Sequence, residues 1–293
     1  ISPEEQGWYY SFLGMASLVT LFELGLSTTT SQITSHLFAH LRWVKNGRVE
    51  GKNNKNFISF FKQASKKYRD RVLLFIPIVF TIGFYIFLNK ANSSSLSDGN
   101  TWVLPWLFLV ISTATNFYLS SFYSVVEGSG EIVEIYSMRF LQAILGSIAC
   151  WVAIYNHHIL FSVAMIPFFS FLVGLIWIYK TKKELIFVNR TNISDDKFDW
   201  SYEVSHLEKN IGLTLIGSFL MSQLATPILF HYQNAVVAGQ MGLSLALVRM
   251  INVISSSWMT RHTADMTKAV SIKDFKAFNY LFNKSAMQSL IIF

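Results

Sequence analysis

Residues 159–179 have the sequence ILFSVAMIPFFSFLVGLIWIY and contain no charged side chain. The hydrocarbon core of a bilayer is about 30 Å thick, and a helix needs about 20 apolar residues to cross it. A helix pairs its backbone groups within itself, which the bilayer core requires because lipid offers them no partners. The stretch therefore predicts a transmembrane helix, and much of the remaining chain has the same character.

The composition of the 293 residues excludes a soluble globular protein. Hydrophobic residues make up 52% of the chain and charged residues 14%, whereas soluble domains carry about a quarter charged residues. The single cysteine, Cys150, excludes an intramolecular disulfide and any metal site with several thiolate ligands. We expect an all-α polytopic membrane protein.

Further apolar runs of similar length predict seven complete spans in total. An eighth span begins near Ala286 and is cut off by the end of the sequence. Because the sequence also starts at Ile1, we expect a fragment that lacks both ends of the protein. The seven predicted spans are approximately Trp8–Thr28, Val72–Leu88, Trp102–Val126, Ile135–Tyr155, Ile159–Tyr179, Ile211–Phe230 and Ala235–Trp258.

The basic residues are segregated between the predicted loops. Of the 24 Lys and Arg residues, 22 lie in loops that fall on one side of the membrane. Cytoplasmic loops carry an excess of Lys and Arg, so this side is predicted to be the cytoplasm. Attraction of these loops to anionic lipid headgroups explains the net charge of +7, and we expect no nucleic-acid partner.

Two basic stretches have the pattern of amphipathic helices. In the first, at about residues 57–70, apolar side chains from Phe57 to Tyr68 share one face and basic side chains the other. The second covers about residues 272–284. Such patterns are typical of helices that lie on the membrane surface. The candidate membrane-surface basic residues are Lys62, Lys66, Lys67 and Arg69.

The order of span, basic loop, amphipathic segment and span occurs twice. Residues 5–13 align with residues 237–245 at a constant shift of 232, and a glycine, Gly7 or Gly239, opens each span. Both copies cross the membrane in the same direction, which predicts parallel repeats related by an axis along the membrane normal. We expect an N-terminal lobe at 1–180, a cytoplasmic linker at 181–209 and the start of a C-terminal lobe at 210–293.

The motifs SPEEQGWYY at residues 2–10, FELGL at 22–26 and Ser35-His36 give the chain a family resemblance. It resembles O-antigen and polysaccharide flippases (Wzx-like) of the multidrug/oligosaccharidyl-lipid/polysaccharide exporter superfamily. The resemblance implies two lobes of six helices, with the first helix missing here, in a bacterial cytoplasmic membrane. It also implies a polyprenyl-diphosphate-linked oligosaccharide as substrate, and a polysaccharide polymerase and glycosyltransferases of the same pathway as partners.

Arg249 is the main candidate substrate-binding residue. It lies ten residues after Gly239, about 15 Å along the helix and near the bilayer midplane, and shares a face with Gly242, Asn252 and Ser256. A charged residue at this depth costs about 2.5–3.5 kcal/mol on insertion scales and is a functional candidate by default. Its planar guanidinium suits the pyrophosphate of a lipid-linked sugar, which would bind in a water-filled cleft between the lobes.

Glu23 is a second ionisable candidate. It lies sixteen residues after Gly7, about 24 Å along the helix and nearer the cytoplasmic boundary. It could line the same cleft. An ion pair between Glu23 and Arg249 that holds the lobes together, or a position among the headgroups, would explain it as well.

Polar amides within other spans are weaker candidates for the lining of the cleft. Interhelical hydrogen bonds explain such residues equally well. The candidates are Asn116, Gln142 and Gln223.

The sequence offers no evident catalytic, metal or cofactor motif, so we expect a transporter that uses an ion gradient or the membrane potential. An exporter of drugs or small cations is an alternative, which the basic midplane residue disfavours. An integral-membrane enzyme, such as a polysaccharide polymerase or acyltransferase, is another. The short outside loops disfavour the polymerase, and the lack of a His or Asp pair within a span disfavours the acyltransferase.

Overall fold

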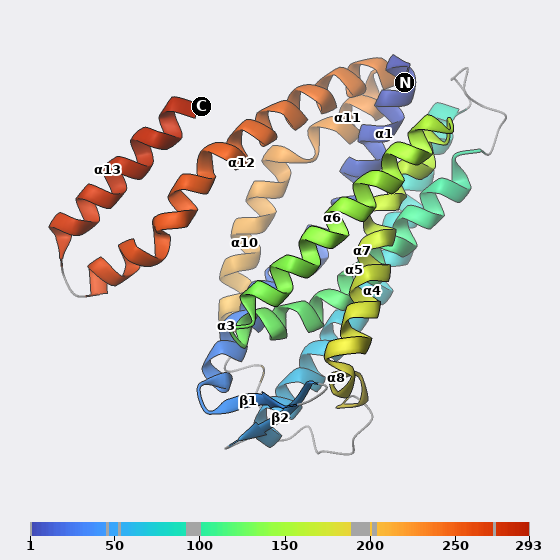
Figure 1. Cartoon of the computed structure of the whole chain (residues 1–293). Coiled ribbons are helices and arrows are strands. Elements are labelled where there is room, and N and C mark those ends of the chain that lie inside the picture. The colour runs from blue at the N-terminus through green and yellow to red at the C-terminus, as the bar shows by residue number, and fades with distance from the viewer. Residues whose placement is uncertain are drawn as a thin grey trace. The chain divides into compact units, whose positions relative to one another are not determined.

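The structure is a computed structural model that describes residues 2–44, 47–51, 54–91, 101–188, 200, 204–271 and 274–292 (Figure 1). The chain divides into two compact units, Ile1–Gly239 and Gln240–Phe293, which are treated separately below. In chain order, the elements are α1 (Pro3–Ala16), α2 (Val19–Glu23), α3 (Leu26–Phe38), β1 (Leu41–Val44), β2 (Arg48–Gly51), α4 (Asn54–Ala91), α5 (Val103–Gly128), α6 (Ile132–Tyr155), α7 (Ile159–Thr181), α8 (Lys183–Val188), α10 (Ser205–Ser222), α11 (Ala225–Tyr232), α12 (Ala235–Ser271) and α13 (Phe275–Ile292).

Within the described residues, five helices are long and apolar enough to cross a membrane, and the number rises to seven if each of two bent helix pairs is one span. The five fall on the predicted spans that begin near Val72, Trp102, Ile135, Ile159 and Ala235. The two bent pairs fall on the predicted spans Trp8–Thr28 and Ile211–Phe230. The chain is therefore a mainly helical polytopic protein, while the two-lobe fold stays a prediction.

A short β-hairpin is the exception to the predicted all-α class. Strands β1 and β2 pair antiparallel, with Leu41 opposite Gly51 and Val44 opposite Arg48. The hairpin lies in the basic loop after the first predicted span, where four residues per strand are too few to give a clear alternating pattern.

Helix α4 corrects the prediction of a separate surface helix at about residues 57–70. These residues form the first half of one continuous 38-residue helix. At 1.5 Å per residue this helix is about 57 Å long, nearly twice the thickness of the bilayer core. The apolar face, from Phe57 to Tyr68, is fully buried and packs against side chains of α3 and α5. The face therefore covers protein, not lipid.

The second predicted surface helix, at about residues 272–284, is also part of a longer helix. Residues 272 and 273 lie outside the described part of the chain, Asp274 precedes the helix, and the segment from Phe275 onward belongs to α13, which runs without interruption to Ile292. The predicted eighth span near Ala286 is thus the second half of the same helix. Helix α12 likewise runs past the predicted end of its span at Trp258 and ends at Ser271.

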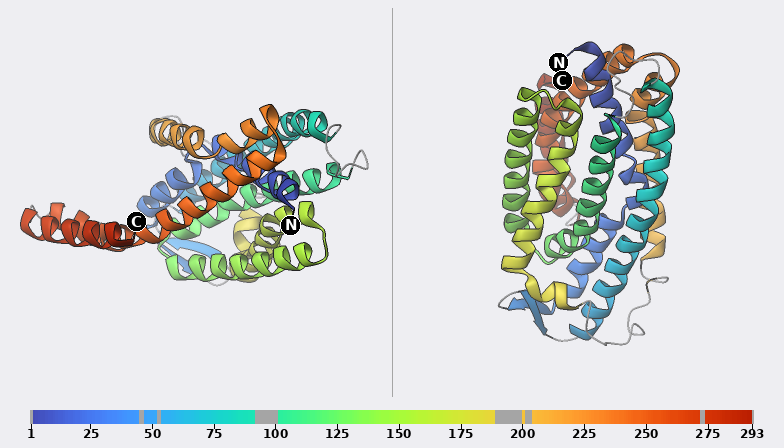
Figure 2. Two further views of the ribbon diagram at one scale, coloured as in Figure 1. Left: turned by 90° about the horizontal axis from the view of Figure 1, so that it is seen from above. Right: turned by 90° about the vertical axis from the view of Figure 1, so that its right-hand side faces the viewer.

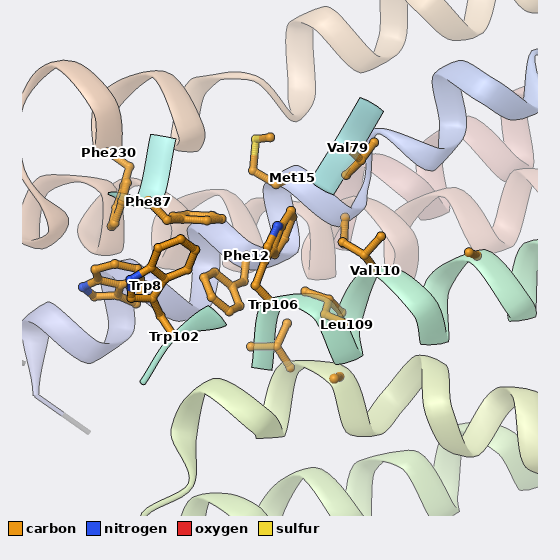
Figure 3. Close-up of a cluster of buried hydrophobic side chains, with 14 of the residues drawn as sticks. Trp8, Phe12, Met15, Val79, Phe87, Trp102, Trp106, Leu109, Val110 and Phe230 are labelled. Atoms are coloured by element: carbon orange, nitrogen blue, oxygen red, sulfur yellow. The ribbon is translucent and has the colours of Figure 1, made fainter. Parts of the chain in front are cut away.

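The first unit is built around α5, α6 and α7, which run alongside one another (Figure 2). An aromatic cluster joins α1, α4, α5 and α11 (Figure 3). In it, the ring centroids of Phe12 and Phe87 lie 4.6 Å apart, and those of Trp8 and Phe230 lie 5.1 Å apart. Aromatic pairs at these distances add about 0.5–1.5 kcal/mol each beyond the burial of their area. The cluster therefore fixes α1 and α11 to the main bundle.

Helices α10 and α11 belong to the first compact unit, since α10 packs on α2 and α11 on α1. The compact unit therefore ends at Gly239, thirty residues after the predicted lobe boundary at 209. Within the predicted linker, residues 189–199 and 201–203 lie outside the described part of the chain. Trp200 is 6% exposed and stacks on Phe60 of α4 at 5.8 Å between ring centroids.

In the second unit, α12 and α13 are joined by a reciprocal pair of hydrogen bonds. The Ser255 hydroxyl donates to the Ser289 carbonyl oxygen at 2.7 Å, and the Ser289 hydroxyl donates to the Ser255 carbonyl oxygen at 2.8 Å. Small polar residues of this kind allow close approach of membrane helices.

We predict that Phe61→Ala destabilises the protein by about 3–5 kcal/mol, because it leaves a cavity where a fully buried ring packs on Phe122. The control is Phe140→Ala on α6, whose side chain is 68% exposed and faces outward. Thermal unfolding in detergent micelles measures both. Equal melting temperatures for the two variants would show that residues 57–70 are not covered by protein.

Candidate functional site

The first bent span is interrupted twice. A turn at Ser17 and Leu18 separates α1 from α2, and Leu24 and Gly25 separate α2 from α3. Leu24 and Gly25 have φ angles of 46° and 76°, in the left-handed region that ends a helix. The helices before and after this second break are bent by 42°.

The second bent span is interrupted between α10 and α11, at Gln223 and Leu224, with a bend of 43°. The two interrupted spans pack against each other. A Cβ atom at Gly14 would lie 2.8 Å from Pro227 Cγ and 3.6 Å from the Gln223 carbonyl oxygen. The end of α1 therefore lies directly against the α10–α11 break.

Interrupted helices within a membrane are tolerated only where protein or water satisfies the freed backbone groups. In transporters, such breaks form substrate and ion sites near the midplane. The region where the interrupted first span packs on α10 and α11 is therefore the candidate functional site of the first unit.

Arg71 of α4 satisfies the freed backbone at the Leu24–Gly25 break. Its Nη1 donates to the carbonyl oxygens of Phe22 at 3.2 Å and Glu23 at 2.6 Å. Carbonyl groups in the last turn of a helix have no partner within the helix, and a cation there also interacts favourably with the helix dipole. Arg71 is thus a cap for α2 supplied from another helix.

Arg71 also forms an ion pair with Glu208, in the first turn of α10. The two side chains are only 21% and 12% exposed. One guanidinium therefore links three elements: α4, the broken first span and α10.

A groove runs beside this ion pair. Its volume is about 410 Å³, its surface is mainly apolar, and its two charged residues belong to the start of α10. The lining residues are Leu24, Glu208, Lys209, Gly212, Leu213 and Ile216.

Two of the predicted site residues lie at the helix breaks. Glu23 is the last residue of α2, and its half-buried carboxylate interacts electrostatically with Arg71. Gln223 is the C-terminal cap of α10, also half-buried. The structure therefore places both near interrupted backbone, and their part in substrate binding stays a prediction.

The two amides of the main bundle differ from each other. Gln142 of α6 is buried and donates to the Tyr123 hydroxyl at 3.2 Å and to the Ser170 carbonyl oxygen at 2.7 Å. Its amide thus joins α6 to α5 and α7, as the packing alternative proposed. The Oδ1 atom of Asn116 on α5 is buried and has no hydrogen-bond partner within the described residues.

Arg249 and Asn252 lie on α12 in the second unit, and both side chains are exposed there, as is Ser256. They form one polar stripe, as the helical spacing predicted. The alternative ion pair between Glu23 and Arg249 stays a prediction.

The basic residues of α4 have several environments. Lys66 and Arg69 are exposed, Lys62 is half-buried, and Arg69 pairs with Asp70 at 3.3 Å. The ammonium of Lys67 lies 5.1 Å from the ring centroid of Trp200. Their predicted contact with anionic lipid stays a prediction.

A second charged cluster, absent from the sequence interpretation, surrounds Lys182 at the end of α7. The Lys182 side chain is 6% exposed and forms an ion pair with Glu131 and a longer one, at 3.9 Å, with Glu134. Its ammonium also lies 4.3 Å from the ring centroid of Trp43 in β1, and Trp43 Nε1 donates to the Ser129 hydroxyl at 2.7 Å. The cluster fastens the β-hairpin to the ends of α5, α6 and α7.

Sequence analysis also missed the pairing of Arg71 with Glu208. Arg71 directly precedes the predicted span Val72–Leu88 and so falls in a basic loop of the sequence interpretation, which gives Glu208 no role. Two signals in the sequence indicate the break: Gly25, two residues after Glu23, and a basic residue directly before an apolar run. Within the described part of the chain, no cluster of three or more His, Cys, Asp or Glu could hold a metal ion.

Comparison with protein-family models gave no match, and neither curated proteins nor solved structures match the chain.

We predict that Arg71→Ala lowers the free energy of unfolding by about 2–3 kcal/mol. This is below the ~3–5 kcal/mol of a fully buried pair, because both partners keep some exposure. The matched control is Arg69→Ala, two positions away, which removes only an exposed pair and should cost less than about 1 kcal/mol. Thermal unfolding in detergent micelles compares the two. Equal losses would mean that Arg71 does not support the break.

Proposed function

We propose that this chain belongs to a transporter of the bacterial cytoplasmic membrane that flips a polyprenyl-diphosphate-linked oligosaccharide, such as an O-antigen repeat unit, by alternating access. The observation that carries the proposal is the contact between two interrupted spans in the first unit. Interrupted helices supply backbone groups and conformational freedom at membrane depth, which a rigid structural bundle does not need.

The internal repeat supports the two-lobe part of the proposal. The aligned glycines Gly7 and Gly239 lie next to each other: a Cβ atom at Gly239 would lie 2.9 Å from the Gly7 backbone nitrogen. Residues beside a two-fold axis contact their own equivalents. A contact between aligned residues is therefore what a parallel repeat about an axis along the membrane normal would produce.

The substrate class follows from the chemistry of the polar stripe on α12. Arg249 is exposed within Ala235–Ser257, the part of α12 that is apolar enough to cross a membrane, and a guanidinium binds phosphate oxygens in pairs while it keeps its charge. A hydrophilic sugar cannot cross hydrocarbon without a polar path, whereas its lipid carrier can stay in the bilayer. A basic site in such a path favours a diphosphate-linked lipid over a cationic drug.

The proposal assigns the chain membrane lipids and a lipid-linked oligosaccharide as ligands. The polymerase and glycosyltransferases of the same pathway would act on the product and supply the substrate. An ion gradient or the membrane potential would drive the cycle, without a resident cofactor.

We predict that Arg249→Ala in the intact protein reduces the export of surface glycan by about tenfold or more, because the loss of hydrogen bonds to a charged group costs about 1.5–3 kcal/mol. Complementation of a flippase-null strain, read as glycan displayed at the cell surface, measures this. Protein abundance in the membrane should be unchanged.

Two control variants sharpen this test. Arg249→Lys keeps the charge but loses the planar fork and should restore export in part. Arg139→Ala removes an exposed arginine that pairs with Glu127 at 2.9 Å and should export normally. Full complementation by Arg249→Ala would refute the role of the guanidinium, and drug efflux without glycan export would favour the exporter alternative.

A further inference from the structure

The α2–α3 break and the start of α10 meet along a seam formed by Leu24 and Gly25 on one side and Ile211 and Gly212 on the other. A Cβ atom at Gly212 would lie 3.1 Å from the Leu24 carbonyl oxygen and 3.3 Å from Leu24 Cβ. A Cβ atom at Gly25 would clash with Ile211. The Ile211 side chain thus packs on Gly25, and Leu24 packs on Gly212. The apolar groove lies beside this contact.

Arg71 has two separable tasks at this seam. Its bonds to the Phe22 and Glu23 carbonyl oxygens stay within the N-terminal helices and cap α2. Its ion pair with Glu208 is the link to α10. Loss of the Glu208 carboxylate would therefore free α10 while it leaves the cap of α2 in place.

After release of the ion pair, each of the two charges would still have favourable interactions. Arg71 would keep its two carbonyl acceptors and the nearby Glu23 carboxylate. Glu208 would remain in the first turn of α10, where the helix dipole stabilises a negative charge. Glu208 also lines the neighbouring groove, so protein does not enclose its side chain completely. The usual penalty for opening a buried ion pair, an isolated charge in low dielectric, is therefore largely absent.

We infer that Arg71 and Glu208 form a releasable clamp between the broken first span and α10, whose opening separates the two sides of the seam. The orientation predicted from the basic loops places this clamp at the cytoplasmic end of both spans. A second statement rests on the proposed function: opening of the clamp is an obligatory step of the transport cycle. Arg71 and Glu208 are positioning residues in this scheme and need not touch the substrate.

Labelling of a single cysteine tests whether the seam opens. In a Cys150→Ser background, Leu24→Cys places a thiol at the half-buried seam. A water-soluble maleimide, added to inside-out membrane vesicles, should label it slowly. Adding Glu208→Gln should raise the labelling rate by about tenfold, the effect of losing one charge-assisted interaction. No labelling in either protein, or equal rates in both, would overturn the clamp.

A disulfide across the seam tests whether opening is required. The 3.3 Å between Leu24 Cβ and the Cβ position of Gly212 is close to the range of about 3.5–4.5 Å found in disulfides. Leu24→Cys with Gly212→Cys should therefore cross-link on oxidation. The matched control is Gly146→Cys with Ile166→Cys, which joins α6 to α7 at 3.7 Å between the same atoms.

The seam disulfide should abolish glycan export, and a reductant should restore it, while the control disulfide leaves export intact. Export that continues with the seam fully cross-linked would refute the obligatory opening. The two proposals can also fail separately. If the maleimide rates change as expected while neither the parent protein nor any variant exports glycan, the clamp stands and the proposed function fails.

Discussion

The bilayer offers no partner to a backbone carbonyl, and this constraint governs the first unit. The chain ends α2 at Glu23 and starts α3 at Leu26, so the carbonyl oxygens of the last turn lose their helical donors. An unpaired buried polar group costs several kcal/mol in hydrocarbon. Arg71 supplies donors for the Phe22 and Glu23 carbonyl oxygens from α4, and in this way it supports the bent path of the first span.

The length of α4 matters for the position of Arg71. A helix that ended at the membrane boundary could present Arg71 only from a frayed first turn. Here about five further turns, residues 54–70, precede Arg71 in α4, and their apolar face is held by α3, α5 and the ring of Trp200. The Lys182 cluster and the β-hairpin pack around the same end of the bundle. These contacts hold Arg71 in register with the break, which a flexible loop residue could not achieve.

The spans could be predicted from the sequence because hydrophobicity over about 20 residues is a local property. The role of the amphipathic segment at residues 57–70 could not, since an apolar face looks the same whether it meets lipid or protein. The Arg71–Glu208 pair joins residues 137 positions apart, and no local pattern connects them. For Gln142, composition left two alternatives open, and only the positions of Tyr123 and Ser170 decide that its amide is used in packing.

The first unit thus contains two kinds of helix contact. Helices α5, α6 and α7 are uninterrupted, and Gln142 hydrogen-bonds across all three, so relative movement among them would break buried polar contacts. Helices α1 to α3 and α10 to α11 are segmented. The α2–α3 break meets α10 at Gly25 and Gly212, and one ion pair, from Arg71 of α4 to Glu208, ties α10 to this region. A bundle that alternates its access needs a part that keeps its shape and a part that hinges at defined residues. Under the proposed function, the α5–α7 group would keep its shape and the two interrupted spans would hinge.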